Sequence, residues 1–359
     1  MPSSPVPSSS GSPSPGPSSG PSSGPSSPDR RLLVTGATGY IGSRLVADLA
    51  RHGLSVVATA RDPDKLAAFG FPEQVGRVEL DVASPTSCAE AFLAAAECLG
   101  GPVTTAYFLV HSIGEGDFAA QDLDSARVFA AAAREAGVTR IVYLGGFVPR
   151  DEDLSEHLES RADVGDALGD AGVETVRLQA AVVLGAGSTS YELIRHIADR
   201  VPVVPLPSWM RHPVSPIAVD DVLRYLRAAA DPDRLPAGSY EISCGESPSY
   251  ASLLEAYAAE RGLRRWWVPF PPLPPAWVAR IAAWLTPLPH ALTADLVLSL
   301  PNSMGSREHR IRDHVADPDG GLTTIADALR RSVRPDPLPD VWQATDPLHL
   351  TSTDPGWAR

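Results

Sequence analysis

From residue 31 the chain alternates short apolar runs with longer amphipathic stretches. Six runs have the length and composition of strands that are buried on both faces: 32–35, 55–60, 77–80, 105–110, 140–144 and 175–184. Asp62 and Ser84 each precede a proline, as helix N-caps often do, and Gly137 and Gly172 are typical helix stops. Because right-handed crossovers join parallel strands, the alternation predicts an α/β protein with a doubly wound parallel sheet.

After residue 185 this rhythm breaks into proline-rich segments, a helix at 220–230 and a short strand at 240–243. We therefore expect a smaller C-terminal lobe at 187–340, whose segment 217–243 returns to the sheet of the domain at 29–186. Residues 341–359 form a C-terminal extension. Ligands of such folds bind beyond the carboxyl ends of the strands, so the cleft should lie between that edge and the lobe.

Residues 1–28 are serine, proline and glycine apart from Met1 and Val6. Such a composition cannot bury enough apolar area to offset chain entropy, which predicts a disordered tail. The tail lacks the basic start and apolar run of a signal peptide, so we expect neither export nor an anchor.

A glycine-punctuated turn joins the first strand to a helix at 40–52 that ends before Gly53. Gly36 permits a tight turn, Gly39 opens the backbone to a pyrophosphate, and Gly42 permits close packing of the helix. The helix N-terminus favours an anion. The motif predicts a Rossmann-type dinucleotide site made by the following residues: Thr35, Gly36, Thr38, Gly39, Tyr40, Ile41 and Gly42.

Arg61 follows the second strand, where an acidic residue would select NAD. A guanidinium binds a 2'-phosphate, so NADP is the expected cofactor and NAD the alternative. Asp62 either contacts the ribose or caps the helix that starts at Pro63, and the N-cap is the favoured interpretation. Asp81 either accepts a hydrogen bond from the adenine amino group or is a turn residue. Three further strand-end residues complete the expected cofactor site: Val82, Leu109 and Val110.

With these features in place, the chain from about residue 31 to beyond Ile217 resembles the extended and atypical short-chain dehydrogenase/reductases. It is most similar to the NmrA-like branch and to the dinucleotide-binding accessory subunit of respiratory complex I. Three segments resemble those of bacterial NAD(P)-binding proteins of that branch: the loop at 111–118, residues 185–188 and residues 216–222. The resemblance implies the fold and cofactor expected above.

The chain departs from that family in its catalytic residues. Active members carry Tyr-x-x-x-Lys on the helix after the fifth strand, but the single lysine here is Lys65, with Arg61 four residues before it. The positions that match the tyrosine and the lysine look like His157 and Arg161, which share a helix face. His157 is either a proton donor or an exposed helix residue, and His111 is either an acid at the cleft or a loop histidine bonded to backbone.

The family's carbonyl-polarising serine is also missing, since Gly145, Gly146 and Phe147 follow the fifth strand. The expected substrate contacts are Gly145, Gln179, Tyr191 and Trp209. The first hypothesis is an NADP(H)-dependent oxidoreductase acting on a small apolar or quinone-like substrate. The second is a catalytically silent NADP(H)-binding sensor or complex-assembly protein, because fold does not imply function. An epimerase or dehydratase ranks third, since it too needs the tyrosine.

The remaining signals concern partners and location. A formal net charge of −13 argues against nucleic acid. Three cysteines without a C-x-x-C pair fit a reducing cytoplasm, and no metal site is expected. The tryptophan-rich segment 266–285, with Trp277, Ile281 and Trp284 at i, i+4 and i+7, is interpreted mainly as lobe core. The alternative is contact with a membrane surface or a quinone, without a transmembrane span.

Overall fold

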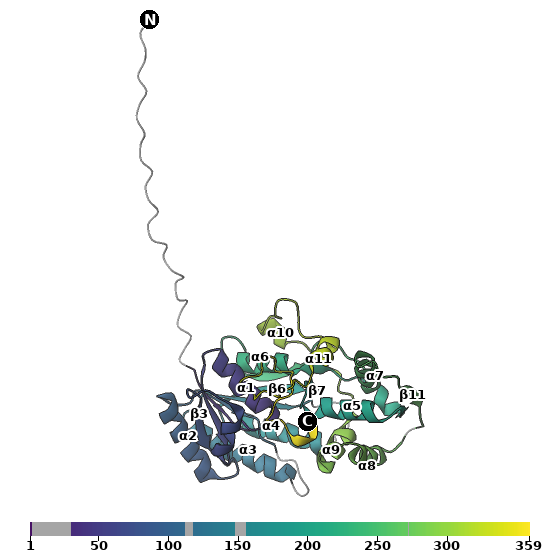
Figure 1. Cartoon of the computed structure of the whole chain (residues 1–359). Coiled ribbons are helices and arrows are strands. Elements are labelled where there is room, and N and C mark those ends of the chain that lie inside the picture. The colour runs from purple at the N-terminus through teal and green to yellow at the C-terminus, as the bar shows by residue number, and fades with distance from the viewer. Residues whose placement is uncertain (2–29, 112–117, 148–155, 272) are drawn as a thin grey trace.

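The computed structural model describes Met1 and residues 30–111, 118–147, 156–271 and 273–359 (Figure 1). The predicted tail at 1–28, except Met1, lies outside the described residues, as does most of the loop at 111–118. Within the described chain, seven parallel strands form one sheet: β1 (Arg31–Val34), β2 (Ser55–Ala60), β3 (Gly76–Glu79), β4 (Thr105–Phe108), β5 (Arg140–Gly146), β6 (Glu174–Ala180) and β10 (Gly238–Ile242). Their order is β10-β6-β5-β4-β1-β2-β3.

Helices cover both faces of this sheet. One face carries α1 (Tyr40–Arg51) and α6 (Val219–Ala229), and the other carries α2 (Pro85–Leu99), α3 (Phe118–Glu135) and α4 (Glu156–Gly169). Successive strand residues point to opposite faces, so Leu32 and Val34 belong to one hydrophobic core while Leu33 belongs to the other. The predicted doubly wound Rossmann-type α/β fold is therefore confirmed.

The predicted N-caps are also present. The Asp62 carboxylate accepts from the Asp64 N–H at the start of η1 (Pro63–Phe69), and the Ser84 hydroxyl accepts from the Ser87 N–H at the start of α2. The predicted strand at 175–184 is two strands, because the chain leaves β6 and continues as β7 (Val182–Leu184). β7 pairs with β9 (Pro216–Ala218) in a separate two-stranded parallel sheet. This is where the chain passes from the large sheet to the lobe.

Much of the smaller C-terminal region lies at the end of the molecule away from β3, whereas its residues 311–314 lie near β10 of the large sheet (Figure 1). Its strands β8 (Val203–Leu206) and β11 (Trp266–Pro269) pair in parallel. Its helices are α5 (Thr189–Arg200), η2 (Ser208–Arg211), α7 (Tyr250–Glu260), α8 (Pro275–Leu285), α9 (His290–Ser299), α10 (Ile311–His314), α11 (Ile325–Arg331) and η3 (Gly356–Ala358). Between these elements, α6 and β10 return to the large sheet, where β10 pairs with β6.

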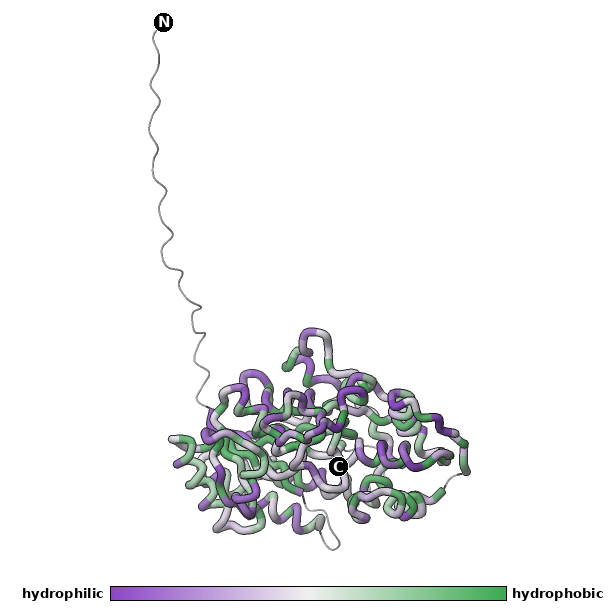
Figure 2. Tube along the Cα trace, in the orientation of Figure 1, coloured by the Kyte–Doolittle hydropathy of each residue, from purple (hydrophilic) through white to green (hydrophobic). Residues whose placement is uncertain are grey.

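The aromatic stripe of α8 does not lie in the lobe core, so that interpretation was wrong for the stripe, although Trp267 and Val278 of the same segment do pack against the core. The buried residues of α8 are the alanines 279, 282 and 283, and the helix is hydrophobic over most of its length (Figure 2). Trp277, Ile281 and Trp284 keep 67%, 51% and 83% of their surface exposed. Small side chains let α8 pack closely on its neighbours, which leaves the large residues on the opposite face. No helix among the described residues is long and apolar enough to span a bilayer.

The C-terminal extension packs against the far side of α1. The buried Arg44 guanidinium makes two hydrogen bonds to the Asp354 carboxylate, at 2.9 and 2.8 Å. It also donates to the carbonyl oxygens of Pro347 and His349, at 2.9 and 3.0 Å. Two turns later, Arg51 donates to the carbonyl oxygen of Ala344 at 2.9 Å. A segment about 300 residues away in the chain therefore holds the first helix.

We predict that Asp354→Ala lowers the free energy of unfolding by about 3 kcal/mol, because it leaves the Arg44 charge buried without its counter-ion. The control is Asp124→Ala, which breaks an exposed pair with Arg127 at 3.3 Å and should cost less than about 1 kcal/mol. Urea denaturation followed by circular dichroism measures both. Equal effects of the two substitutions would contradict the structural role of the buried pair.

Candidate functional site

Two of the three glycines of the turn, Gly36 and Gly42, are required by geometry. Gly36 has a φ of +63°, and a Cβ there would lie 2.9 Å from the Leu109 carbonyl oxygen. A Cβ on Gly42 would lie 2.2 Å from the Gly36 carbonyl oxygen, so only glycine lets α1 pack against the turn. Gly39 is exposed with extended backbone, and its Cβ would lie 3.2 Å from the same oxygen. The tight turn expected at Gly36 and the close packing expected at Gly42 are present, whereas the role of Gly39 toward a pyrophosphate stays a prediction.

The start of α1 suits a phosphate group. In the described chain, Gly39 supplies no side-chain cap to the helix, and its first turn carries no acidic residue. The backbone N–H groups of that turn and the positive end of the helix dipole therefore remain available to an anion. Since no side chain stands at Gly39, a pyrophosphate can reach these groups. The cradle fits a dinucleotide.

A cleft of about 290 Å³ opens from this turn. One wall is the glycine turn, a second is the carboxyl ends of β4 and β5, and a third is the N-terminus of α5. The α9 residues Leu292, Asp295 and Leu296 form the side contributed by the lobe. The cleft thus lies between the sheet edge and the smaller lobe, where the sequence predicted it.

The expected cofactor residues divide into two groups. Six line the cleft: Gly36, Gly39, Tyr40, Ile41, Gly42 and Leu109. Thr35 is buried behind them, and its hydroxyl accepts a hydrogen bond from the Leu109 N–H at 3.0 Å, which ties β1 to β4. Thr38 is exposed beside the turn, while Val82 and Val110 pack against the core on the opposite face of the sheet from α1.

Arg61 lies at the carboxyl end of β2 with its side chain exposed, and it makes no hydrogen bond or ion pair with the residues described. Its neighbour Asp62 is occupied as the η1 N-cap and lies 3.6 Å from the Lys65 ammonium. Arg44 is not available to a phosphate, because Asp354 holds it in the interior. Arg61 and Lys65 are therefore exposed cations that follow the carboxyl end of β2.

Asp81 ends β3 in a local turn. Its carboxylate accepts from the Ala83 N–H at 3.1 Å, and its own N–H donates to the Ser87 hydroxyl at 2.9 Å. These bonds fit the turn residue considered from the sequence. The carboxylate is exposed at the same sheet edge as Arg61, so contact with an adenine stays a prediction.

Two of the three expected catalytic residues line the cleft. His111 follows β4 and is exposed, and Arg161 lies on α4. His157 lies one turn earlier on α4, but its side chain is outside the described residues. A Cβ on Gly145 would lie 2.7 Å from the Tyr143 ring, whose hydroxyl donates to the Arg161 carbonyl oxygen at 3.3 Å. The tyrosine ring thus occupies the space that a serine at position 145 would need.

Of the expected substrate contacts, Gly145 lines the cleft. Gln179 lies beside it in register on β6 and faces an adjoining hollow of about 200 Å³, which Gly145 and Arg161 also line. Tyr191 and Trp209 are not in the cleft. The buried Tyr191 hydroxyl donates to the Ser332 carbonyl oxygen at 2.9 Å, and the Trp209 indole N–H donates to the Leu273 carbonyl oxygen at 3.0 Å. Both side chains hold the lobe together.

The structure adds polar cleft residues that the sequence did not identify. Ser188, Thr189 and Ser190 line the cleft at the start of α5, where Ser188 is the N-cap. Tyr250 also lines it, and its hydroxyl lies 3.9 Å from the Met304 sulfur. Burial raises the pKa of Tyr250, which therefore keeps its proton at neutral pH. In the sequence, the segment at 185–188 was the one feature that drew attention to the start of α5. Nothing in the sequence placed Tyr250 or Asp295 at the cleft.

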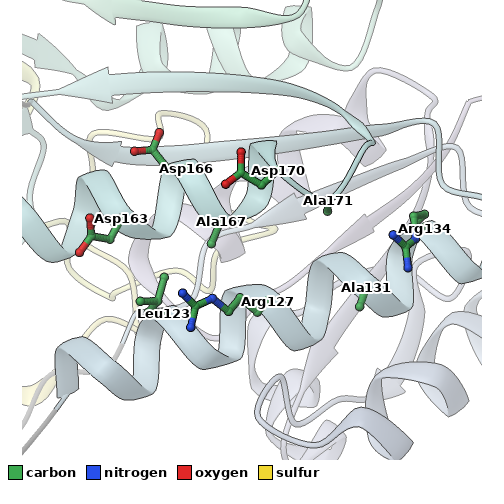
Figure 3. Close-up of a pocket in the computed structure, with 9 residues that line it drawn as sticks. All are labelled: Leu123, Arg127, Ala131, Arg134, Asp163, Asp166, Ala167, Asp170 and Ala171. Carbon is green, nitrogen blue, oxygen red and sulfur yellow. The ribbon is translucent and has the colours of Figure 1, made fainter.

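A larger hollow of about 500 Å³ lies between α3 and α4. Figure 3 shows Arg127 and Arg134 on α3 with Asp163, Asp166 and Asp170 on α4. This hollow lies on helices that cover the sheet rather than at its carboxyl edge, and charged side chains of both signs surround it. Among the described residues there is also no group of three or more histidine, cysteine, aspartate or glutamate side chains that could hold a metal ion.

Comparison with known proteins agrees with this geometry. Residues 36–173 match a family described as NAD(P)H-binding. A nucleoside-diphosphate-sugar epimerase from Staphylococcus aureus aligns with a TM-score of 0.63 and 16% identity, over 84% of this chain and 100% of its own. Triphenylmethane reductase from Citrobacter sp., complexed with NADP(H), aligns with a TM-score of 0.64 and 15% identity, over 84% and 99%.

A UDP-glucose 4-epimerase from Thermotoga maritima aligns with a TM-score of 0.60 and 14% identity, over 83% of this chain and 96% of its own. No curated protein sequence matches significantly. At these identities the solved structures establish the fold alone. The fold, the glycine cradle and the family match together define an NAD(P)H-binding Rossmann domain joined to a smaller C-terminal region.

We predict that the protein binds NADPH in the micromolar range or tighter, and that Gly39→Asp weakens binding at least about 100-fold by placing a carboxylate against the pyrophosphate. The extended backbone at Gly39 accepts any residue, so the variant should fold. Gly39→Ala is the matched control and should lose much less affinity. Calorimetry decides the matter, and unchanged affinity in the aspartate variant would place the phosphates elsewhere.

Proposed function

We propose that this chain is an NADP(H)-dependent oxidoreductase of the atypical short-chain type that acts on a small apolar or quinone-like substrate. The observation that carries the proposal is the cleft itself. It continues from the glycine cradle to a pocket walled by Leu109, Leu144 and Phe147 and by apolar residues of α9. A bound nicotinamide supplies the hydride chemistry, and the protein binds and orients the reactants.

The walls of this cleft favour an apolar substrate over a sugar nucleotide. The cleft has polar side chains at the start of α5 and on α9, but Gly145 and Gly146 present only backbone at the carboxyl end of β5, beside the apolar Leu109, Leu144 and Phe147. The same fold in Citrobacter sp. belongs to a protein named as a reductase of triphenylmethane compounds and complexed with NADP(H). That likeness supports a reductase on this scaffold. Three free cysteines, Cys88, Cys98 and Cys244, are consistent with a cytoplasmic location.

NADP is the preferred cofactor in this proposal because Arg61 and Lys65 stand exposed where the adenosine ribose of such folds lies. The proton would come from a group at the cleft. His111 is the strongest candidate, since Arg161 stays charged and cannot release a proton at neutral pH. His157 on the same helix face as Arg161 is the second candidate.

A second function is favoured by one observation. The chain's single lysine is exposed on η1, where it pairs with Asp62, so no lysine stands at the cleft to assist a proton transfer. In that case the protein binds NADP(H) without turning it over, as a sensor or as a component that stabilises a complex.

Steady-state turnover separates the two functions. We expect the wild-type protein to oxidise NADPH in the presence of a soluble quinone or another apolar carbonyl compound, and we expect Gly39→Asp to remove this activity. His111→Gln should lower kcat at least about tenfold while leaving NADPH affinity unchanged, as loss of a general acid does. Tight NADPH binding without turnover of any acceptor would favour the silent binder.

Arg61→Glu should invert the cofactor preference. In the wild type the guanidinium contributes about 1.5 to 3 kcal/mol to binding of the 2'-phosphate, which is roughly 10- to 150-fold in favour of NADPH. Glutamate repels the phosphate and offers an acceptor to the ribose hydroxyls of NADH. The ratio of the NADH dissociation constant to the NADPH dissociation constant should therefore fall from above one to below one. The variant Lys65→Glu measures how much the neighbouring Lys65 ammonium contributes to binding of the 2'-phosphate. Equal binding of NADPH and NADH by the wild type would overturn the assignment of Arg61.

A further inference from the structure

Large hydrophobic side chains are exposed mainly at one end of this protein. Among the described residues, the exposed large hydrophobics are Met1, Leu93 on α2 and a group in the C-terminal lobe. We call the principal members of that group the Trp-rich face: Trp266, Val268, Phe270, Trp277, Ile281 and Trp284. Trp266, Trp277 and Trp284 expose 74%, 67% and 83% of their surface, so these indoles do not contribute to the core.

Two elements present the Trp-rich face. On the β8–β11 ribbon, Trp266 pairs with Val203, and both are exposed. The next residue on β8, Val204, points to the other face and is buried. On α8, Trp277 and Trp284 lie on the face opposite the buried alanines. Both elements lie at the end of the molecule farthest from β3 (Figure 1). Monomeric proteins rarely expose several large apolar residues in one region without a partner.

The charge of the segment that carries most of this face differs from that of the rest of the chain. Residues 261–294 contain four arginines and no aspartate or glutamate, although the whole chain carries a net charge of −13. Arg264 and Arg280 are exposed and make no ion pair with any residue that the structure describes. An apolar surface with unpaired cations is complementary to a partner that has an apolar interior beneath an anionic surface layer.

We propose that the Trp-rich face docks this protein peripherally on an anionic phospholipid bilayer. The indole rings lie at the level of the lipid headgroups, which is where tryptophan is enriched in membrane proteins. Arg264 and Arg280 contact the lipid phosphates. A second copy of the chain fits this surface less well, because a symmetric contact would bring the arginines of both copies together.

The location of the face also has a consequence for the cleft. α8 packs against α9, and Leu292 and Leu296 of α9 line the cofactor cleft. A membrane at α8 would therefore lie one helix layer from the substrate pocket. If the proposed function holds, an apolar or quinone-like substrate dissolved in the bilayer would be concentrated next to its site. This consequence rests on the proposed function, whereas membrane binding does not.

Cosedimentation of the full-length protein with sucrose-loaded vesicles tests the proposal. We expect binding to phosphatidylcholine vesicles that contain about one third phosphatidylglycerol, and at least about tenfold weaker binding to pure phosphatidylcholine. The double variant Trp277→Ser, Trp284→Ser should weaken binding to the anionic vesicles at least about tenfold. Arg264→Glu with Arg280→Glu should remove the preference for anionic lipid.

Leu93→Ser is the matched control, since Leu93 is 69% exposed on α2, outside the lobe, and its loss should leave vesicle binding unchanged. NADPH affinity, measured for each variant, confirms that the protein is folded. Absence of binding to anionic vesicles, or binding that both double variants retain, would overturn the proposal. A dimer found by light scattering and lost in the tryptophan variant would assign the face to a second copy. Because binding is measured without turnover, its result is independent of the proposed activity.

Discussion

The contact between α1 and the turn that precedes it determines the placement of much of this structure. Because Gly42 has no side chain, the helix lies directly against the Gly36 carbonyl group, at a distance that no other residue permits. This contact points the helix N-terminus at the cleft. It also fixes the direction of the helix, so that Arg44 and Arg51 on its far side meet the C-terminal extension. One close backbone contact thus sets both the phosphate cradle and the surface that holds the chain's end.

The C-terminal extension holds both helices whose N-termini open onto the cleft. Asp354 binds Arg44 of α1, and a Cβ on Gly187, just before α5, would lie 2.8 Å from the same carboxylate group. Farther along α5, the buried His196 ring lies 3.1 Å from the Trp357 carbonyl oxygen, and burial lowers its pKa to about 4, so it is neutral at physiological pH. Since α1 and α5 contact the same segment, their N-termini keep a fixed relation across the cleft.

The sequence predicted the features that depend on local chemistry. The strands of the large sheet, the close packing at Gly36 and Gly42 and the N-caps at Asp62 and Ser84 follow from residues that are neighbours in the chain, and the structure contains them. Features that depend on distant packing were missed. The burial of Arg44 depends on a residue 310 positions later, and the contribution of α9 to the cleft depends on how the lobe folds back. Periodicity placed Trp277, Ile281 and Trp284 on one face of α8, but it could not say whether that face was buried.

The polar groups of the cleft show where this chain differs from the family that it resembles. There the catalytic pair stands on the helix after the fifth strand, so the Rossmann domain alone positions it. Here that helix contributes Arg161, while Ser188 and Tyr250 come from segments outside the parallel sheet. Their distances from a bound nicotinamide would therefore depend on how the lobe sits against the sheet. Because the C-terminal extension bridges α1 and α5, its packing belongs to the geometry of the site as well as to the stability of the fold.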